Sequence, residues 1–346
     1  MDDRFFWCPV CEEPHVQDDL PLTCLLRDEG ATDLAHDTIS DASAPMQMRS
    51  MRAGTLIDER YVIEGRIGEG GMGAVFRAKD LRVGRIVALK TLHGEFADNS
   101  RAAQRFEREA QVMAALSHPG VVQVLDFGVL DSRAAYLVME LLAGETLGDV
   151  LDREGRLGVE ESCSTACQVL ATLSAVHKKG FVHRDLKPAN LYLASVGATR
   201  MVKLLDFGLS RETRQSAVRL TNPGTVLGTP FYMSPSLIRG QDSSARTDVY
   251  AVALLLFEML CGDLPVLFGD EPLIKTFQKI LGAPRRDPRS LNPDLPQDLA
   301  ELLVTAVAGD GGFETAYDLL MAIDATQQGA YMRSEQSRLL PPTSPH

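Results

Sequence analysis

Two stretches of alternating apolar and polar residues flank a cluster of glycines, and this arrangement limits what the amino-terminal half of the chain can form. The stretches span residues 60–67 and 74–79, and their period of two is typical of half-buried β-strands. A third apolar stretch follows at 85–91. A dinucleotide-binding turn would need a helix directly after the glycines, whereas this chain continues as another strand. The sequence therefore predicts a small sheet with a glycine-rich flap.

Helical periodicity dominates after Gly144. Before that point, one helix is predicted at 101–117 and two more strands at 121–127 and 135–141. The later helices are expected near residues 160–179, 245–260, 271–281, 296–308 and 313–325. The predicted fold class is α+β, with a small β-rich part followed by a larger helical part.

The charge and the apolar runs exclude several classes of partner. At a net charge of −12 the chain repels phosphate backbones and anionic membrane surfaces, so we expect neither nucleic acid nor a membrane as its partner. The longest apolar run, 249–261, contains Glu258 and is shorter than the roughly 20 residues that span a bilayer, so it predicts a buried helix. The start at Met1 lacks the basic and apolar regions of a secretion signal, which predicts a cytoplasmic protein.

The glycine cluster consists of Gly68, Gly70 and Gly73, followed by Val75. Because glycine has no Cβ, such a loop lets backbone amides approach phosphate oxygens closely. An ordinary hairpin turn contains similar glycines, so the cluster alone leaves both interpretations open.

A lysine ends the third predicted strand. Lys90 follows apolar residues directly, where an ammonium group needs an anionic partner. Glu109 falls on the apolar face of the helix predicted at 101–117 and is the candidate. The pattern predicts a Lys90–Glu109 ion pair, with two solvated charges as the alternative.

The densest set of chemical groups lies at 183–190. This segment joins the carboxylate of Asp185, the ammonium of Lys187 and the amide of Asn190 within six residues. These groups supply a base, a cationic clamp and a metal ligand. The set predicts a reaction centre.

A hairpin is predicted directly after this segment, from strands at 191–194 and 201–205. Asn190 precedes the first strand and Asp206 follows the second, so the two side chains should meet at the open end of the hairpin. Oxygen ligands of this kind suit Mg²⁺, which keeps water molecules and adds phosphate oxygens.

Together, the glycine loop, the strand lysine, the segment 183–190 and the Asp-Phe-Gly triplet at Asp206 resemble the signature motifs of protein kinases. The resemblance runs from about residue 56 to about residue 325. It is closest to the bacterial serine/threonine kinases, through the Gly-Glu-Gly-Gly-Met-Gly loop and the run at 291–296. It implies a two-lobed fold and an enzyme that phosphorylates serine or threonine hydroxyls of protein substrates.

The resemblance also assigns residues to an ATP site. Lys90 would bind the α- and β-phosphates while it pairs with Glu109, and Met139 would gate the pocket behind the adenine. The ATP-site residues in full would be Gly68, Gly70, Gly73, Val75, Ala88, Lys90, Glu109, Met139, Glu140 and Leu142.

The same resemblance implies the chemistry of transfer. Asp185 would take or orient the proton of the substrate hydroxyl, and Lys187 would steady the γ-phosphate. Asn190 and Asp206 would hold Mg²⁺ or Mn²⁺.

The segment between the triplet and residue 230 resembles an activation segment. Thr229 would contact the catalytic residues and favour serine or threonine over tyrosine. Arg184 resembles the arginine that receives an activating phosphate, and Thr221 and Thr225 are the candidate phosphosites. Autophosphorylation in trans would involve dimerisation.

The chain departs from the family at one ion pair. The activation segment of kinases usually closes with Ala-Pro-Glu, whose glutamate pairs with an arginine late in the domain. Here Ser236 replaces the acid and Gly312 stands where the arginine is expected. Breaking one half of a buried pair would cost about 3–5 kcal/mol, whereas the loss of both halves strands no charge. We therefore expect the fold to survive and the substrate platform to be held less firmly.

Cysteines are concentrated near the amino terminus, where Cys8, Cys11 and Cys24 resemble part of a zinc ribbon. His15 or Asp28 could complete the set of ligands. Unpaired thiols in a short exposed segment, or a redox dithiol, are the alternatives. The remaining cysteines are expected in the core: Cys163, Cys167 and Cys261.

The sequence predicts the following organisation: a zinc-ribbon-like module at 1–30, a flexible linker at 31–54, a kinase domain at 55–325 with lobes at 55–142 and 143–325, and a disordered tail at 326–346. An active kinase is the favoured interpretation. A pseudokinase scaffold that binds ATP, and a phosphotransferase acting on small molecules, are the alternatives.

Overall fold

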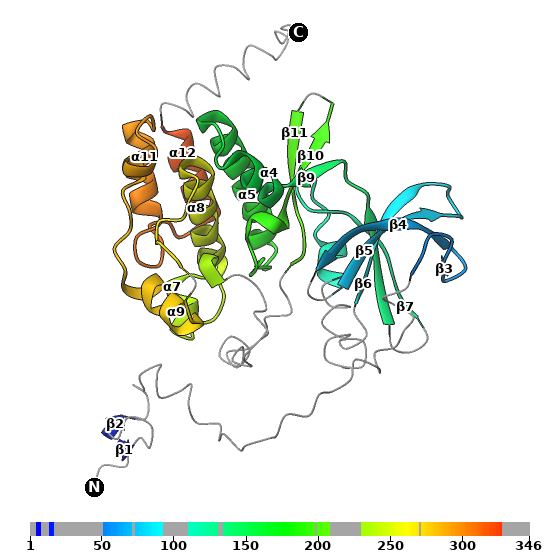
Figure 1. Cartoon of the computed structure of the whole chain (residues 1–346), viewed down its shortest axis with the longest axis horizontal. Coiled ribbons are helices and arrows are strands. Elements are labelled where there is room, and N and C mark those ends of the chain that lie inside the picture. The colour runs from blue at the N-terminus through cyan, green and yellow to red at the C-terminus, as the bar shows by residue number, and fades with distance from the viewer. Residues whose placement is uncertain are drawn as a thin grey trace, which may run out of the picture.

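A computed structural model describes this chain at residues 5–7, 14–16, 51–70, 73–92, 110–130, 134–197, 199–207, 230–269 and 271–326. Within these ranges, a six-stranded sheet and a cluster of helices form two lobes, with a three-stranded sheet between them (Figure 1). The α+β, two-lobed architecture implied by the sequence is confirmed.

The six-stranded sheet is antiparallel throughout and forms the amino-terminal lobe. Its strand order is β3-β4-β5-β6-β8-β7. The strands are β3 (Leu56–Ile57), β4 (Tyr61–Gly70), β5 (Gly73–Asp80), β6 (Ile86–Leu92), β7 (Val124–Leu130) and β8 (Ala134–Glu140). Strands β4 and β5 remain paired up to Gly70 and Gly73, so the glycine cluster joins two strands and precedes no helix. The flap prediction is confirmed, and a dinucleotide-binding turn is excluded.

The three-stranded sheet has the order β11-β10-β9 and lies next to the helices (Figure 1). Its strands are β9 (Gly144–Thr146), β10 (Leu191–Val196) and β11 (Thr199–Leu204). Leu191 pairs with Leu204, which confirms the predicted hairpin. The periodicity did not predict β9 or the helix α4 (Leu147–Glu154) that follows it. Thr146 starts this helix, because its side chain and that of Asp149 cap each other's backbone N–H groups.

The helical lobe is built around α8 (Ala245–Cys261), whose residues from 247 to 257 are all buried. The other helices are α5 (Val159–Lys178), α7 (Pro235–Ile238), α9 (Leu273–Gly282), α10 (Pro288–Leu291), α11 (Gln297–Ala306) and α12 (Ala316–Asp324). The long apolar run therefore forms a buried helix, as predicted. In the described ranges, no helix combines the length and apolar character that crossing a membrane requires.

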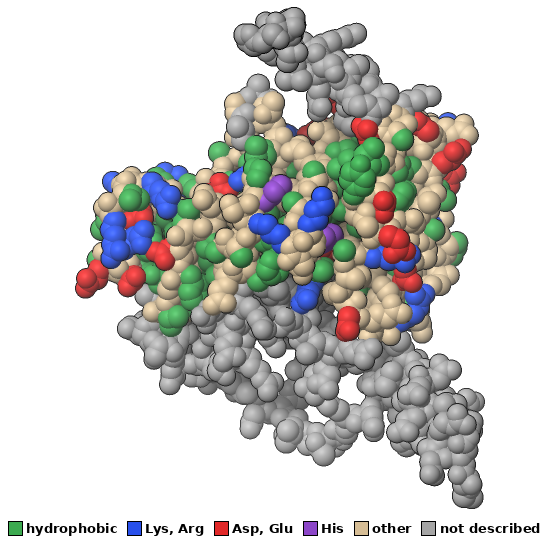
Figure 2. Space-filling model, turned by 180° about the vertical axis from the view of Figure 1, so that it is seen from behind, with side chains coloured by type: hydrophobic (Ala, Val, Ile, Leu, Met, Phe, Trp, Pro, Cys, Tyr) green, Lys and Arg blue, Asp and Glu red, His purple; other side chains and the backbone are tan. Residues whose placement is uncertain are grey.

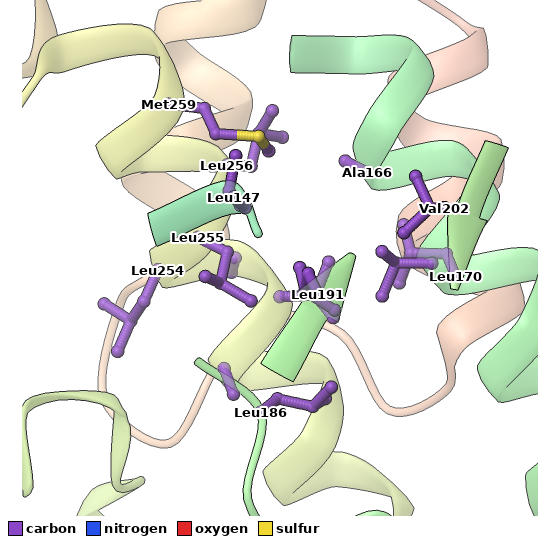
Figure 3. Packing of buried hydrophobic residues seen from close by; sticks show 14 of the residues in the cluster. Leu147, Ala166, Leu170, Leu186, Leu191, Val202, Leu254, Leu255, Leu256 and Met259 are labelled. Carbon is purple, nitrogen blue, oxygen red and sulfur yellow. The ribbon is translucent and has the colours of Figure 1, made fainter. Parts of the chain in front are cut away.

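One hydrophobic cluster connects α8 to the residues before and after the reaction centre (Figure 3). Leu186, Leu191 and Leu255 come from the loop 181–187, from β10 and from α8, and all three are buried in this cluster. Burial of one leucine side chain contributes about 1.5–3 kcal/mol. Asp185 and Asn190 thus each directly precede a residue of this core.

The amino-terminal lobe has a core of its own, which contains Tyr61, Phe76 and Val138. Arg60, next to Tyr61, links three strands of the sheet region: its guanidinium donates to both carboxylate oxygens of Asp80 and also to Asp126. On the face of the molecule in Figure 2, Lys and Arg side chains of the described residues lie at scattered places among acidic ones.

The cysteines expected in the core behave as buried thiols. Cys163 and Cys261 are buried and Cys167 is half-buried. Burial raises the pKa of Cys163 and Cys261 to about 12 and that of Cys167 to about 11, so these thiols stay protonated.

Gly144 provides a test of the join between the two lobes. It has a φ of 141°, and an added Cβ would lie 2.1 Å from the carbonyl oxygen of Leu193. Gly144→Ala should therefore separate β9 from β10 and lower the free energy of unfolding by about 1–3 kcal/mol. Gly158→Ala is the matched control, because no atom lies within 4 Å of its added Cβ. Thermal unfolding of both variants measures the effect. Equal melting temperatures would contradict this role of Gly144.

Candidate active site

The loop between α5 and β10 is held by a carboxylate from α8. Asp248 is buried, and its Oδ2 and Oδ1 atoms accept hydrogen bonds from the backbone N–H groups of His183 (2.7 Å) and Arg184 (2.9 Å). His177 Nε2 lies 2.9 Å from the same Oδ2. Arg184 has a φ of 71°, which is strained for a residue with a side chain. The bonds to Asp248 hold the backbone in this conformation.

His183 links this loop to the strand that precedes Asp206. It is completely buried, and burial lowers the pKa of its imidazole, so the ring is neutral. Its Nε2 lies 2.9 Å from the carbonyl oxygen of Leu205, and its Nδ1 accepts the N–H of Asp185 at 3.4 Å. The neutral ring therefore donates to Leu205 and accepts from Asp185. Its ring also packs against Phe207, with 4.6 Å between centroids.

Asp185, Lys187 and Asn190 form one cluster. Lys187 Nζ donates to Asp185 Oδ2 at 2.8 Å. Asn190 Nδ2 donates to the same oxygen at 2.9 Å and to the carbonyl oxygen of Asp185 at 2.7 Å. The base, the cation and the amide singled out in the sequence are thus in direct contact.

The hairpin brings Asp206 to the same place. Leu205 N–H donates to the carbonyl oxygen of Asn190 at 2.9 Å, so Asn190 and Asp206 lie at the open end of the β10–β11 pair, as predicted. Asp206 has a φ of 43°, another strained position.

Lys90 reaches across from the six-stranded sheet. Its Nζ lies 2.6 Å from Asp206 Oδ1, and its side chain is largely buried. The sequence pointed to Glu109 as the partner of Lys90. Glu109 lies outside the described residues, so that pair stays a prediction. The contact with Asp206 brings the phosphate lysine and a metal ligand of the predicted site together.

The residues expected around the adenine lie on adjacent strands. Ala88 of β6 pairs with Met139 of β8, and Val75 of β5 pairs with Lys90. Ala88 and Met139 are buried, whereas Val75 and Leu142 are half-buried. A Cβ added at Gly68 would meet nothing closer than 3.7 Å, so packing within the protein does not explain this glycine.

Glu140 ends β8, and its carboxylate points to the helical lobe. Its Oε1 accepts the N–H of Gln123 at 2.9 Å and the ammonium of Lys203 at 2.6 Å. Lys203 lies on β11, and only 13% of its side chain is exposed. The pair thus connects the end of the large sheet to the strand that leads to Asp206.

Residues 230–238 form a platform beside the loop 181–187. Tyr232, Met233 and Leu237 line a cavity of about 20 Å³ together with Asp185, Lys187 and other residues of that loop and α8. Tyr232 donates to Glu258 at 2.6 Å. Burial raises the pKa of Glu258 above its usual range. Thr229, Thr221 and Thr225 lie outside the described residues and stay predictions.

The donors present fit a magnesium ion that also binds phosphate. Asp206 offers a carboxylate, and Asn190 uses its Nδ2 for Asp185, which leaves its Oδ1 oxygen for a cation. No cluster of three or more His, Cys, Asp or Glu residues suited to a metal occurs among the described residues.

The amino-terminal zinc prediction is not tested by this geometry. The described residues there are β1 (Phe5–Trp7) and β2 (Pro14–Val16), which pair antiparallel. Cys8, Cys11, Cys24 and Asp28 lie outside the described residues.

Sequence reasoning missed three groups that shape this site: Asp248, Lys203 and Glu258. Each lies far along the chain from its partner. An acid in the first turn of a buried helix was the signal available for Asp248. For the other two residues no local pattern indicates the partner.

Comparisons with known proteins agree with this geometry. The family model described as protein kinase domain matches residues 61–308. A probable serine/threonine-protein kinase of Clostridium perfringens is 35% identical over 269 residues, which is 77% of this chain and 38% of that protein. The serine/threonine-protein kinase PknA of Mycobacterium tuberculosis is 38% identical over 258 residues, 73% of this chain and 58% of PknA.

A solved structure shows the same fold. The kinase domain of Mycobacterium tuberculosis PknI superposes with a TM-score of 0.61 at 26% identity, over 80% of this chain and 99% of that domain. The chain spans less than two thirds of the length of the curated relatives above.

Lys203 provides a test of the contact between the lobes. Lys203→Met leaves the Glu140 carboxylate with one backbone donor from Gln123, so the end of β8 should shift. We expect the affinity for a fluorescent ATP analogue to fall about tenfold, in line with the loss of a charged hydrogen bond. Lys275→Met changes an exposed lysine of α9 and is the control. Unchanged affinity in Lys203→Met would contradict this role of the pair.

Proposed function

This chain belongs to the protein kinase domain family, in its bacterial serine/threonine branch, and we propose that it transfers the γ-phosphoryl group of ATP to serine or threonine hydroxyls of protein substrates. One observation carries the proposal. Asp185, Lys187 and Asn190 are in contact at the open end of the hairpin, next to the Lys90–Asp206 pair. A base, cations and a metal-binding carboxylate thus converge at one point.

Each residue of the cluster takes a distinct role in this proposal. Asp185 accepts or orients the proton of the substrate hydroxyl, and Lys187 offsets the negative charge that develops on the transferred group. Asn190 and Asp206 hold Mg²⁺, which neutralises phosphate charge when bound.

The glycine flap and the sheet bind the nucleotide. The backbone of Gly68, Gly70 and Gly73 covers the phosphates. Lys90 gives up its contact with Asp206 and binds the α- and β-phosphates instead. The adenine lies among the side chains of β5, β6 and the end of β8, namely Val75, Ala88, Met139, Glu140 and Leu142.

Several predictions from the sequence belong to the same proposal. The kinase domain spans 55–325, with Thr229 in the activation segment, Thr221 and Thr225 as its phosphosites, and Arg184 as the arginine that receives the activating phosphate. The protein acts in the cytoplasm, and dimerisation serves autophosphorylation in trans. Zinc at Cys8, Cys11 and Cys24 stays a prediction from the spacing of these cysteines.

Incubation with γ-³²P-ATP, Mg²⁺ and casein tests the proposal. Asp185→Asn removes the base and Lys90→Met removes the phosphate anchor. Each should lower phosphate transfer at least about a hundredfold, which corresponds to about 3 kcal/mol. Both variants should melt close to the wild-type temperature.

Lys79→Met is the matched control, because this lysine lies exposed on β5. It should keep the wild-type rate. A wild-type chain that transfers no phosphate with Mg²⁺ or Mn²⁺ would contradict the proposed function. Variants at the wild-type rate would contradict the assignment of Asp185 and Lys90.

A further inference from the structure

The loop 307–314 cannot carry the arginine that the family has at this place. A Cβ added at Gly312 would lie 2.5 Å from the carbonyl oxygen of Thr305 and 2.8 Å from its Cγ2. Gly309 and Gly311 have φ values of 52° and 97°. The loop backbone therefore lies directly against the end of α11, and Gly312→Arg would displace it.

The opposite partner is also absent. Ser236, on α7, bonds its hydroxyl to that of Ser234 at 2.9 Å, within the platform itself. Neither Ser236 nor Gly312 therefore connects the platform to the loop 307–314. The family contact is missing from both sides.

A different ion pair joins the same two segments. Arg239 follows α7 directly, and its Nη1 lies 3.0 Å from Asp310 Oδ2 and 3.2 Å from Asp310 Oδ1. Here the residue directly after the platform supplies the cation and the loop supplies the acid. The polarity is the reverse of the family pair.

Two further arginines bind this loop from outside. Arg246 of α8 donates to the carbonyl oxygen of Gly311 at 2.9 Å and contacts Glu314 at 2.6 Å. Arg285 donates to the carbonyl oxygen of Val307 at 3.3 Å. The glycine-rich loop thus presents acceptors to Arg239 after α7, to Arg246 of α8 and to Arg285 after α9.

The platform lies next to the reaction centre, so the position of α7 affects that centre. Leu237 of α7, together with Tyr232 and Met233, lines the small cavity beside Asp185 and Lys187. Tyr232 fixes the other end of the platform to Glu258. A shift of α7 therefore moves groups that lie next to the catalytic loop.

We propose that the Arg239–Asp310 pair replaces the family's Glu–Arg pair and positions the substrate platform 230–238 against the catalytic loop. This inference rests on the proposed function. Asp310 and Arg239 are positioning residues, because they act through α7. The substrate that depends on them is the phosphate-accepting protein, whereas ATP binds at the other side of the site.

The solvent exposure of Arg239 and Asp310 determines how much free energy their ion pair contributes. The side chains of Arg239 and Asp310 are 48% and 31% exposed, so water and salt screen their attraction. Pairs of this kind contribute about 0.2–1 kcal/mol, which corresponds to about 1.4- to fivefold in an equilibrium constant. A like charge at position 310 replaces attraction by repulsion and should act more strongly.

The test compares Asp310→Asn, Asp310→Lys and the swap Arg239→Glu with Asp310→Lys. With casein as acceptor, Asp310→Asn should raise the KM for casein about 1.4- to fivefold and leave the KM for ATP unchanged. Asp310→Lys should raise it further. The swap should return it to within about twofold of wild type, because the ion pair is restored with opposite polarity.

A second measurement does not depend on activity. Amide hydrogen exchange in residues 230–241 should be faster in Asp310→Lys than in wild type and should slow again in the swap. The control is Arg77→Gln, which removes an ion pair of similar exposure, Arg77–Glu64, from the other lobe. It should change neither the KM for casein nor this exchange.

Unchanged exchange in Asp310→Lys, or a swap that restores nothing, would overturn the inference. An equal rise in both KM values would also overturn it, because that is the result of general destabilisation. A wild-type chain that transfers no phosphate but shows the expected exchange pattern would contradict the proposed function alone.

Discussion

The bonds from Asp248 to the backbone of His183 and Arg184 are the contact on which the rest of the site depends. A buried carboxylate is stable only when its oxygens accept hydrogen bonds, and this loop supplies the donors. These hydrogen bonds fix a strained backbone conformation at Arg184, which directly precedes Asp185. The position of Asp185, the proposed base, is therefore set by a helix that begins sixty residues later.

The buried helix α8 serves both sides of the reaction centre. Asp248 near its start holds the catalytic loop, and Glu258 near its end holds Tyr232 of the substrate platform. Two ion pairs, Glu140–Lys203 and Lys90–Asp206, connect the six-stranded sheet to the helical lobe. Partly exposed ion pairs break at a low cost in free energy, whereas breaking the packed core around α8 costs much more. This difference suits the proposed function, in which ATP would enter between the lobes while the loop 181–187 stays in place.

Local patterns in the sequence predicted much of this site, and contacts between distant segments did not follow from them. The period of two around the glycines predicted the flap, and the hairpin prediction correctly placed Asn190 with Asp206. The predicted pair of Lys90 with Glu109 lies outside the described residues, and the contact of Lys90 with Asp206, 116 residues away, was not predicted. The pair between Arg239 and Asp310 spans 71 residues. Such pairings depend on how the helices and strands pack against each other, and the periodicity of the sequence does not predict this packing.

The rate of phosphate transfer by Asp248→Asn tests the central claim most directly. The amide replaces one acceptor by a donor, so a backbone N–H of His183 or Arg184 loses its partner. We expect kcat to fall at least about tenfold, about 1.4 kcal/mol, with little change in the KM for ATP. Asp242→Asn changes an exposed acid just before α8 and should leave kcat unaltered. A wild-type kcat in Asp248→Asn would contradict the dependence of the site on this carboxylate.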